Sequence, residues 1–416
     1  MALYTIGIYL YGFALRLAAL LHPKAQKWVQ GRQNWADHHR QLRAALPKDR
    51  DLFWFHCASL GEFEQGRPLI EALKQRTNPP LILLTFYSPS GYEVRRNYPE
   101  ADAVTYLPLD TPAQARVFLE IWQPQLAVFV KYEFWFNMLR QLQQKEVPIL
   151  LISGLFRPGQ VFFKPFGGPF RRLLKGFGHL FVQNEASGQQ LEQAGITRYT
   201  VAGDTRIDRV QSIADGAPAI PIAADFCQSA PVLVAGSSWP EDEAYLLPYI
   251  NQELPAAWKV IIAPHEIAEA HLQRIEQQLS LTVVRYGKVE GHPEKLHAAR
   301  VLLIDNIGML SALYQYGRIA YVGGGFKTGL HNTLEPIAFG LPVLFGPRYH
   351  KFEEARYLVA QGGGFVIENA DALSEALEKL QRPEAYQEAS AKALQYIQQN
   401  QGATQKVLSW IESAGL

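Results

Sequence analysis

The segment GGGFKTGLHNTLEPIAFGLPVLFGP, residues 323–347, decides the fold prediction, because it joins a strand end, a glycine-rich loop and a helix start. It follows the apolar run RIAYV (318–322), typical of a buried strand, and contains LPVLF (341–345), which predicts the next strand. Three consecutive glycines allow a sharp turn and close approach of a ligand to the backbone. Asn332 or Thr333 is expected to cap a short helix whose free N–H groups favour an anion such as phosphate. The alternative is an ordinary strand–loop–helix unit with glycines for packing.

Further polar positions join this predicted nucleotide site. Glu335 falls in the first turn of the expected helix, where a carboxylate can accept hydrogen bonds from both vicinal hydroxyls of a ribose. APHE (263–266) and NIGML (306–310) also end apolar strands and begin helices, so both offer free backbone N–H groups. His265 adds a side-chain donor. Together these segments are expected to ring one pocket.

Short apolar strands alternate with helical patterns along the chain. In the first half the expected strands are 52–57, 81–86, 126–130, 148–153 and 179–183; in the second half they are 231–236, 259–263, 281–285, 300–304, 318–322 and 341–345. This alternation indicates parallel sheets covered by helices on both faces. The fold class is therefore α/β, with two Rossmann-like domains facing a cleft, as in the GT-B architecture of glycosyltransferases. The same outline fits some sugar-nucleotide epimerases and binding proteins.

The expected domain boundaries follow from composition. Residues 1–22 form an anchor helix, 23–205 a first Rossmann-like domain and 231–416 a second one. The segment 206–230, rich in Ala, Pro and Asp and without a clear period, is predicted to be the linker.

Composition indicates a globular protein of 416 residues that is 48% hydrophobic and 19% charged. A formal net charge of +1 and the lack of a basic run with interleaved aromatics give no sign of a nucleic-acid partner. Cys57 and Cys227 form neither a CxxC pair nor a zinc pattern. Asp49 and Asp51 match the letters of a metal-binding DxD motif but precede the first strand, at the wrong edge of the sheet. We therefore expect no metal.

The N-terminal run LYTIGIYLYGFALRLAALL (3–21) is interrupted only by Arg16. It is close to the ~20 residues that a membrane-spanning helix needs. No basic residue precedes it, which disfavours a secretory signal, and its tyrosines suit a membrane interface. The basic residues that follow place the body of the protein in the cytoplasm by the positive-inside tendency. A spanning helix, a helix lying in one leaflet and a buried amphipathic helix remain open.

Three charged residues of the first half lie at predicted strand ends, where ligands of such sheets bind. Glu62, in CASLGEFEQG, falls at a helix start whose dipole favours its ionised form, so it can act as a general base. Glu133, in KYEFWFN, stands among aromatics, where a carboxylate has a raised pKa or holds a basic partner. Arg206, in GDTRIDR, can place a permanent positive charge against a leaving phosphate. Helix capping or surface positions are the structural alternatives.

At these motifs the sequence resembles the 3-deoxy-D-manno-octulosonic acid (Kdo) transferases of lipopolysaccharide synthesis. The resemblance covers nearly the whole chain and is carried by ASLGEF (58–63), YEFW (132–135), VGGGF with GLHNTLEP (322–336) and GLPVLFGP (340–347). It implies a membrane-associated, inverting GT-B enzyme on the cytoplasmic face of the inner membrane. Such an enzyme moves Kdo from CMP-Kdo to a lipid A precursor, lipid IVA, with no metal and no cofactor.

The resemblance also implies residue roles. Glu62 falls on the general base, Glu133 on an acid that helps to stabilise the transition state, and Arg206 where the family usually has lysine. The first domain would bind the acceptor and the second the CMP-sugar donor. The implied CMP contacts are Pro264, His265, Ile307, Gly308, Met309, Asn332, Thr333, Leu334 and Glu335.

Three departures from the family pattern affect this assignment. Ala263-Pro264-His265 stands where the family commonly has Pro-Arg-His, Lys131 replaces an acid, and Phe136 replaces a proline. Two alternatives also remain: another GT-B transferase or epimerase using a UDP-sugar, and a non-enzymatic two-lobed sugar- or nucleotide-binding protein.

Overall fold

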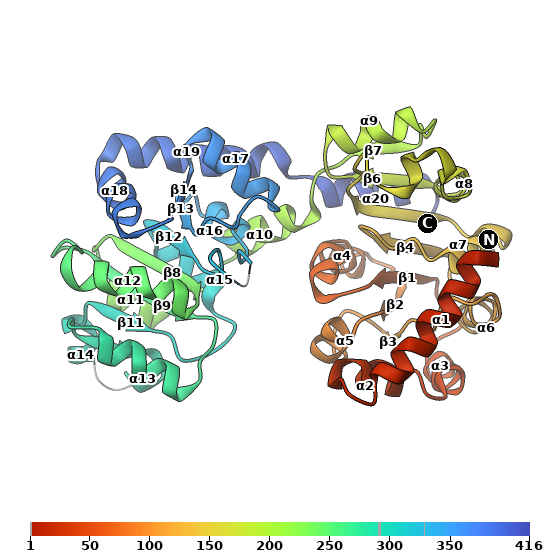
Figure 1. Ribbon diagram of the computed structural model, residues 1–416, viewed down its shortest axis with the longest axis horizontal. Coiled ribbons are helices and arrows are strands. Elements are labelled where there is room, and N and C mark those ends of the chain that lie inside the picture. Colours follow the sequence, from red (N-terminus) through yellow and green to blue (C-terminus); the bar gives the residue numbers. More distant parts are fainter. Residues whose placement is uncertain (1, 290–292, 328) are drawn as a thin grey trace. The chain divides into compact units, whose positions relative to one another are not determined.

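The computed structural model describes residues 2–289, 293–327 and 329–416. Met1 of the predicted anchor and Thr328 of the glycine-rich segment lie outside these ranges. The chain forms two compact units (Figure 1): one comprises the chain up to Asp208 together with Gln401–Leu416, and the other comprises Arg209–Asn400.

The first unit is built on a parallel sheet in the order β3-β2-β1-β4-β5-β6-β7. Its strands are β1 Leu52–Cys57, β2 Leu81–Phe86, β3 Ala103–Tyr106, β4 Leu126–Val130, β5 Ile149–Gly154, β6 His179–Val182 and β7 Tyr199–Val201. Its helices are α1 Ala2–Ala18, α2 Pro23–Gln30, α3 Trp35–Ala44, α4 Leu60–Lys74, α5 Pro89–Arg95, α6 Pro112–Trp122, α7 Phe136–Gln144, α8 Gly168–Lys175, α9 Glu185–Gln193 and α20 Ala403–Ser413, with short 3₁₀ turns η1 Val161–Phe163 and η2 Pro165–Gly167.

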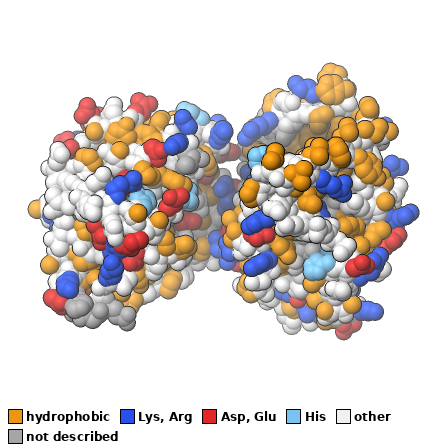
Figure 2. Space-filling view, turned by 60° about the horizontal axis from the view of Figure 1, so that its bottom comes forward, with side chains coloured by type: hydrophobic (Ala, Val, Ile, Leu, Met, Phe, Trp, Pro, Cys, Tyr) orange, Lys and Arg blue, Asp and Glu red, His pale blue; other side chains and the backbone are white. Residues whose placement is uncertain are grey.

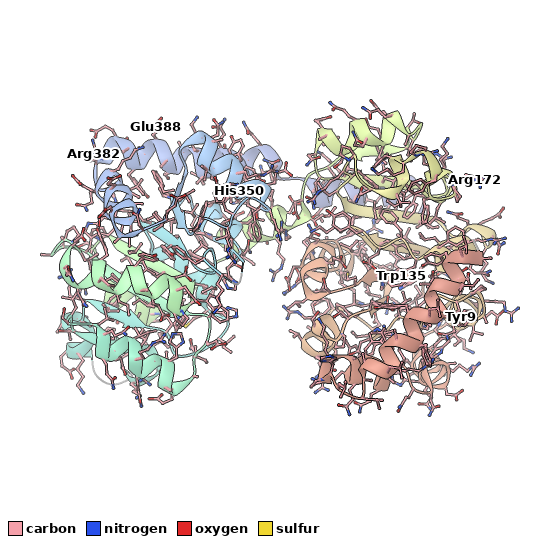
Figure 3. All side chains as sticks on the ribbon, viewed as in Figure 1. Tyr9, Trp135, Arg172, His350, Arg382 and Glu388 are labelled. Carbon is pink, nitrogen blue, oxygen red and sulfur yellow. The ribbon has the colours of Figure 1, made fainter. Side chains whose placement is uncertain are left out.

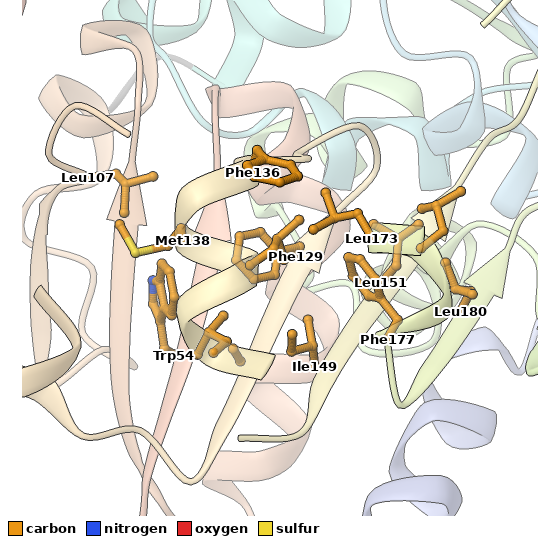
Figure 4. Close-up of a cluster of buried hydrophobic side chains, with 14 of the residues drawn as sticks. Trp54, Leu107, Phe129, Phe136, Met138, Ile149, Leu151, Leu173, Phe177 and Leu180 are labelled. Atoms are coloured by element: carbon orange, nitrogen blue, oxygen red, sulfur yellow. The ribbon is translucent and has the colours of Figure 1, made fainter. Parts of the chain in front are cut away.

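The central strands are continuously apolar because both faces of the sheet are buried. Alternate side chains of a strand point to opposite faces. Trp54 of β1 therefore joins the cluster that contains Phe129, Met138 and Phe177 (Figure 4), whereas Phe55 of the same strand joins the cluster on the other face.

The N-terminal helix α1 lies against the first unit and also exposes much apolar surface. The Tyr4 hydroxyl donates to Asp110 Oδ2 at 2.7 Å, and a Cβ at Gly12 would lie 2.7 Å from Leu109 Cδ2. Large hydrophobic side chains on and after the helix are exposed by 45–84%: Leu3, Ile6, Tyr9, Leu10, Tyr11, Phe13, Leu17, Leu20 and Leu21. Figure 3 labels Tyr9 on this helix, and Figure 2 shows hydrophobic side chains gathered on the surface of the first unit. Within the described residues, none of the helices combines the length and apolar character needed to cross a membrane.

The second unit repeats the doubly wound plan, with a parallel sheet in the order β10-β11-β9-β8-β12-β13-β14. Its strands are β8 Val232–Ser238, β9 Lys259–Pro264, β10 Val283–Arg285, β11 Val301–Leu303, β12 Ile319–Val322, β13 Val343–Phe345 and β14 Gly364–Val366. Its helices are α11 Pro221–Cys227, α12 Pro240–Gln252, α13 Glu269–Gln278, α14 Pro293–Ala298, α15 Leu310–Leu313, α16 Leu334–Ala338, α17 Glu353–Gln361, α18 Ala370–Gln381 and α19 Pro383–Asn400, with 3₁₀ turns η3 Tyr286–Lys288 and η4 Tyr314–Tyr316.

The predicted α/β class with two Rossmann-like domains is confirmed. Each strand expected from the sequence is present, several of them shortened by one or two residues. The short strands β3, β7 and β14 were not predicted; they lie at or toward the sheet edges. Their three or four residues are too few for a distinct apolar run.

The division of the chain differs from the expected boundaries in two places. Residues 401–416, expected in the second domain, belong to the first unit, because Ala403, Val407 and Ile411 of α20 are buried in its core beside α4. The expected linker 206–230 is largely helical: α10 (Thr205–Asp215) crosses the boundary, and α11 packs on α14 of the second unit.

A carboxylate adds hydrogen bonds to the apolar contacts that attach α20 to the first unit. Asp208 of α10 accepts hydrogen bonds from the backbone N–H groups of Gly402 at 2.5 Å and Thr404 at 2.6 Å. It thus satisfies donors at the start of α20, as an N-cap side chain does.

We predict that Asp208→Ala destabilises the docking of α20 by about 1 kcal/mol, the usual cost of a lost N-cap. Hydrogen exchange of the α20 amides should become faster by the corresponding factor of about five. Asp215→Ala is the control, because that exposed carboxylate bonds only the Gln211 side chain, at 2.7 Å, among the described residues. Equal protection of α20 in both variants would contradict the role of Asp208.

Candidate active site

Glu62 lies in the first turn of α4, directly after β1. Its Oε2 accepts a hydrogen bond from the Ala58 N–H at 2.5 Å. Burial and then the negative charge of Glu133 raise the pKa of Glu62 to about 7, although the backbone hydrogen bond acts in the opposite direction. The helix start was expected to keep Glu62 ionised; burial beside a second acid outweighs it. The result is a carboxyl group that exchanges its proton near neutral pH.

Glu133 is buried and follows β4, the neighbour of β1 in the sheet. Its Oε2 lies 3.2 Å from His56 Nε2 and 2.5 Å from Trp135 Nε1, so it has the basic partner that the sequence allowed for. Because β1 and β4 are adjacent and parallel, the residues after their carboxyl ends meet at one edge. Glu62 and Glu133 are therefore close enough for their charges to interact.

A cationic group lies beside this acid pair. Arg206 binds Asp204 Oδ2 through Nε at 2.9 Å and Nη2 at 2.7 Å. Burial opposes ionisation of Asp204, but the Arg206 charge and hydrogen bonds hold the pKa of Asp204 below its usual value. Burial and then Arg206 lower the pKa of Lys131, which also interacts with Glu62. The first unit thus brings Glu62 and Glu133 together, and Lys131 interacts with both Glu62 and Arg206.

The second unit has a cavity of about 300 Å³ at the carboxyl ends of its central strands. Its walls come from the ends of β8 and β12, from the start of α15 and from the segment before α16: Ser237, Gly308, Leu310, Ser311, Tyr314, Val322, His331, Asn332 and Glu335. Glu335 accepts from Ser311 Oγ at 2.6 Å and from Asn332 Nδ2 at 2.9 Å. A carboxylate with two donors already in place is well fixed to receive hydroxyl groups.

Three rings are stacked beside this cavity. The His265 ring centroid is 4.5 Å from that of Trp239 and 4.5 Å from that of His331. Trp239 Nε1 donates to His331 Nε2 at 2.9 Å. Burial and then His265 lower the pKa of His331 to about 4, so this ring is neutral at physiological pH.

The glycine-rich loop is shaped mainly by neighbouring backbone. A Cβ at Gly323 would lie 2.2 Å from Ser237 O, and one at Gly325 would lie 2.6 Å from Gly346 N. Gly324 has a φ of +88°, and its N–H donates to Asp242 Oδ2 at 2.9 Å. These glycines allow two protein segments to approach each other; the space of their missing side chains is filled by protein.

The predicted CMP contacts separate into three groups. Gly308, Asn332 and Glu335 line the cavity. His265 lies in the ring stack, Ile307 is 87% exposed, and Met309 is half-buried at the N-terminus of α15. The remaining ones, Pro264, Thr333 and Leu334, are buried. Asn332 rather than Thr333 caps the short helix, because its Oδ1 accepts from the Leu334 N–H at 3.1 Å.

Several site residues were missed from the sequence. His56 is one residue of an apolar strand, and neither Trp239 nor Ser311 belongs to a motif that the sequence analysis assigned a role. Trp239 could have been found from its position, because it directly follows β8 and ligands of such sheets bind at the carboxyl ends of the strands. His331 belongs to a motif that was recognised, but the motif alone does not show its contact with Trp239.

Comparisons with known proteins show which family and which folds this chain resembles. Residues 33–209 match the family model described as 3-deoxy-D-manno-octulosonic-acid transferase (kdotransferase). The Kdo transferase of Bordetella pertussis is 29% identical over 378 residues, covering 86% of this chain and 86% of the relative. That of Aquifex aeolicus is 27% identical over 351 residues, covering 82% and 90%. A UDP-GlcNAc 2-epimerase from Neisseria meningitidis, 17% identical, has the same fold, with a TM-score of 0.60 over 87% of this chain and 99% of that structure.

The fold has the GT-B architecture, and the matching family model and relatives identify a glycosyltransferase. The matched segment contains Glu62, Glu133 and Arg206, and similarity to the curated relatives continues through the second unit. Residues 33–209 thus match the Kdo transferase model, and Kdo transferases are similar to this chain over most of its length, as its motifs predict. This similarity favours a Kdo transferase over the two alternatives left open by the sequence, another GT-B transferase or epimerase using a UDP-sugar and a non-enzymatic binding protein. The individual site residues, the lipid acceptor and the independence of a metal or cofactor stay predictions.

We predict that Gly323→Ala destabilises the second unit by about 1–3 kcal/mol, because a methyl group has no room against Ser237 O. Urea unfolding followed by the fluorescence of Trp239 measures this. Gly216→Ala is the matched control, since its Cβ would make only an ordinary contact, 3.4 Å from Ser212 O. Unchanged stability of Gly323→Ala would show that the loop is not held by this contact.

Proposed function

We propose that the protein transfers Kdo from CMP-Kdo to the lipid A precursor lipid IVA with inversion at the anomeric carbon. The observation that carries this proposal is the acid pair of the first unit. Glu62 is a half-buried carboxylate with a pKa of about 7, next to a second buried acid, within the segment that matches the Kdo transferase model. Enzymes tune general bases toward this range.

In the proposed reaction, ionised Glu62 takes the proton of an acceptor hydroxyl. The hydroxyl oxygen forms a bond to the anomeric carbon of Kdo from the face opposite CMP. The bond from that carbon to the phosphate oxygen breaks, and CMP leaves with the electron pair. Glu133 stabilises the positive charge that develops on the sugar, and Arg206, which is held by Asp204, stabilises the negative charge that grows on the phosphate. No metal takes part.

We assign donor binding to the cavity of the second unit. Glu335 is placed to accept hydrogen bonds from the ribose hydroxyls of CMP, since Ser311 and Asn332 already orient it. The ring stack that ends in the exposed face of His265 offers a surface for the cytosine base.

The acceptor is a lipid, and we propose that α1 holds the protein on the cytoplasmic side of the inner membrane. Tyr4 and Gly12 fix one side of the helix to the first unit, while Leu3, Leu10 and Phe13 expose 84%, 64% and 59% of their surface. A helix with one face on protein and the other apolar and exposed suits an orientation in the plane of one leaflet.

We predict that Glu62→Gln lowers kcat for Kdo transfer by about 10²–10⁴, the usual contribution of a general base. Mass spectrometry of the lipid after incubation with CMP-Kdo measures the transfer. In the native enzyme the rate should fall below a pH of about 7, because protonated Glu62 cannot accept the proton. Glu64→Gln on the same helix is the control; its carboxylate pairs with Arg95 at 2.9 Å. Near-normal transfer by Glu62→Gln would rule out the base assignment.

We also predict that the pair of changes Leu3→Glu and Leu10→Glu releases the protein from vesicles of phosphatidylethanolamine and phosphatidylglycerol. Two charges on the exposed face oppose its insertion among acyl chains. Flotation of the intact protein with the vesicles is the measurement. Val94→Glu is the control, because Val94 is a 58% exposed hydrophobic residue of α5. Flotation that persists in the double variant would contradict membrane binding through α1.

A further inference from the structure

One stripe of side chains on α1 faces the first unit. Its members recur at helical spacing and are buried or half-buried: Tyr4, Ile8, Gly12 and Leu15. Tyr4 packs against one cluster of buried residues in this unit, and Ile8 and Leu15 pack against another. The exposed face of α1 is thus available to a membrane, while the opposite face is part of the fold.

Helix α7 begins three residues after Glu133 and has no capping side chain of its own. The first N–H groups of a helix have no partners within the helix. The residue directly before α7 is Trp135, whose indole group donates a hydrogen bond but cannot accept one. The acceptors for the start of α7 must therefore come from other parts of the chain.

Two distant residues, Tyr4 and Asp110, supply these acceptors. The Phe136 N–H donates to the Tyr4 hydroxyl at 3.4 Å. The Asn137 N–H donates to Asp110 Oδ2 at 3.0 Å, and the Met138 N–H donates to Oδ1 of the same carboxylate at 2.8 Å. The first three N–H groups of α7 are consequently all paired, one of them by a residue of α1.

Tyr4 and Asp110 are also bonded to each other. The Tyr4 hydroxyl donates to Asp110 Oδ2 at 2.7 Å, and Asp110 is fully buried. A hydroxyl group has one proton to donate and lone pairs to accept with, so Tyr4 can serve Asp110 and the Phe136 N–H together. Removing this hydroxyl would leave the Phe136 N–H without its acceptor and would free one side of the Asp110 carboxylate.

The start of α7 in turn fixes the segment that carries Glu133. Trp135 Nε1 donates to Glu133 Oε2 at 2.5 Å and lies 2.9 Å from His56 Nε2. The Trp135 ring packs on Tyr87, with centroids 4.4 Å apart, and Tyr87 is stacked on Tyr11 of α1 at 6.4 Å. Helix α1 therefore reaches the segment around Glu133 at a second point.

We propose that α1 positions the proposed active site as well as contacting the membrane: Tyr4, acting through Asp110 and the start of α7, keeps the segment with Glu133 in place for Kdo transfer. This inference rests on the proposed function. Tyr4 is a positioning residue, because it acts through other groups. A displacement of about 1 Å at a reacting centre can lower a rate by about 10²-fold, so a fixed helix start matters for catalysis.

The test compares Tyr4→Phe with Tyr9→Phe, each of which removes one hydroxyl from α1. Tyr4→Phe keeps the ring against Phe136, with centroids 5.6 Å apart. Tyr9 is the matched control (Figure 3), because it is 55% exposed and its hydroxyl bonds to no residue that the structure describes. With lipid IVA in detergent micelles, where vesicle binding is not required, we expect Tyr4→Phe to lower kcat by about tenfold. KM for CMP-Kdo should be unchanged, and Tyr9→Phe should keep the native rate.

Flotation with vesicles and a double-mutant cycle separate positioning from anchoring and from general packing. Both variants should float with vesicles of phosphatidylethanolamine and phosphatidylglycerol as the native protein does. If Tyr4 acts through Glu133, Tyr4→Phe should change kcat by less than about twofold in a Glu133→Gln background. Normal transfer by Tyr4→Phe in micelles, or an equal loss in both backgrounds, would overturn the inference alone. A native enzyme that transfers no Kdo would instead contradict the proposed function.

A readout independent of activity is the ¹⁹F spectrum of the intact protein labelled with 5-fluorotryptophan. The signal absent from Trp135→Phe belongs to Trp135. This signal should shift in Tyr4→Phe, because the start of α7 loses an acceptor, and should stay in place in Tyr9→Phe. An unshifted Trp135 signal in Tyr4→Phe would overturn the proposal even if the variant lost activity.

Discussion

The close approach of two carboxyl groups, Glu62 and Glu133, is the constraint on which the first unit depends. They meet because β1 and β4 are adjacent parallel strands, so the segments that follow them leave the same edge of the sheet. Two negative charges in a partly desolvated environment repel each other. The two carboxyl groups have different hydrogen-bond partners. Glu133 contacts His56 and accepts a hydrogen bond from Trp135, whereas Glu62 accepts from the Ala58 N–H and has a pKa of about 7.

In the second unit, hydrogen bonds hold polar groups in place around a cavity. Asp242 holds the glycine-rich loop through Gly324 N–H and the Tyr321 hydroxyl, each at 2.9 Å. Ser311 and Asn332 hold Glu335. The sequence GGG suggested room for a ligand, but the backbone of Ser237 and Gly346 occupies that room. The glycines therefore do not make room for a ligand; they allow the segments around the cavity to pack closely against one another.

Much of this organisation could be predicted from the sequence. Continuous apolar runs indicated the central strands, because a sheet covered on both faces buries every residue. Strand-end acids such as Glu62 were recognisable, since polar residues directly after such strands are few. His56 was not, because the residues that it contacts, Thr85 and Glu133, come from β2 and from the segment after β4. The ring stack of Trp239, His265 and His331 also joins three separate segments. Residues 401–416 were misplaced because an amphipathic helix does not reveal which of two cores it covers.

The position of α20 has a consequence for biosynthesis. Ala403, Val407 and Ile411 complete the apolar layer over α4, the helix that carries Glu62. These residues leave the ribosome only after the whole of the second unit has been translated. The unit that begins first is therefore the one that finishes last: its sheet can form early, but the layer that supports the proposed base closes only when the helix beyond residue 400 returns to it. Order of synthesis and order of completion are reversed in this chain.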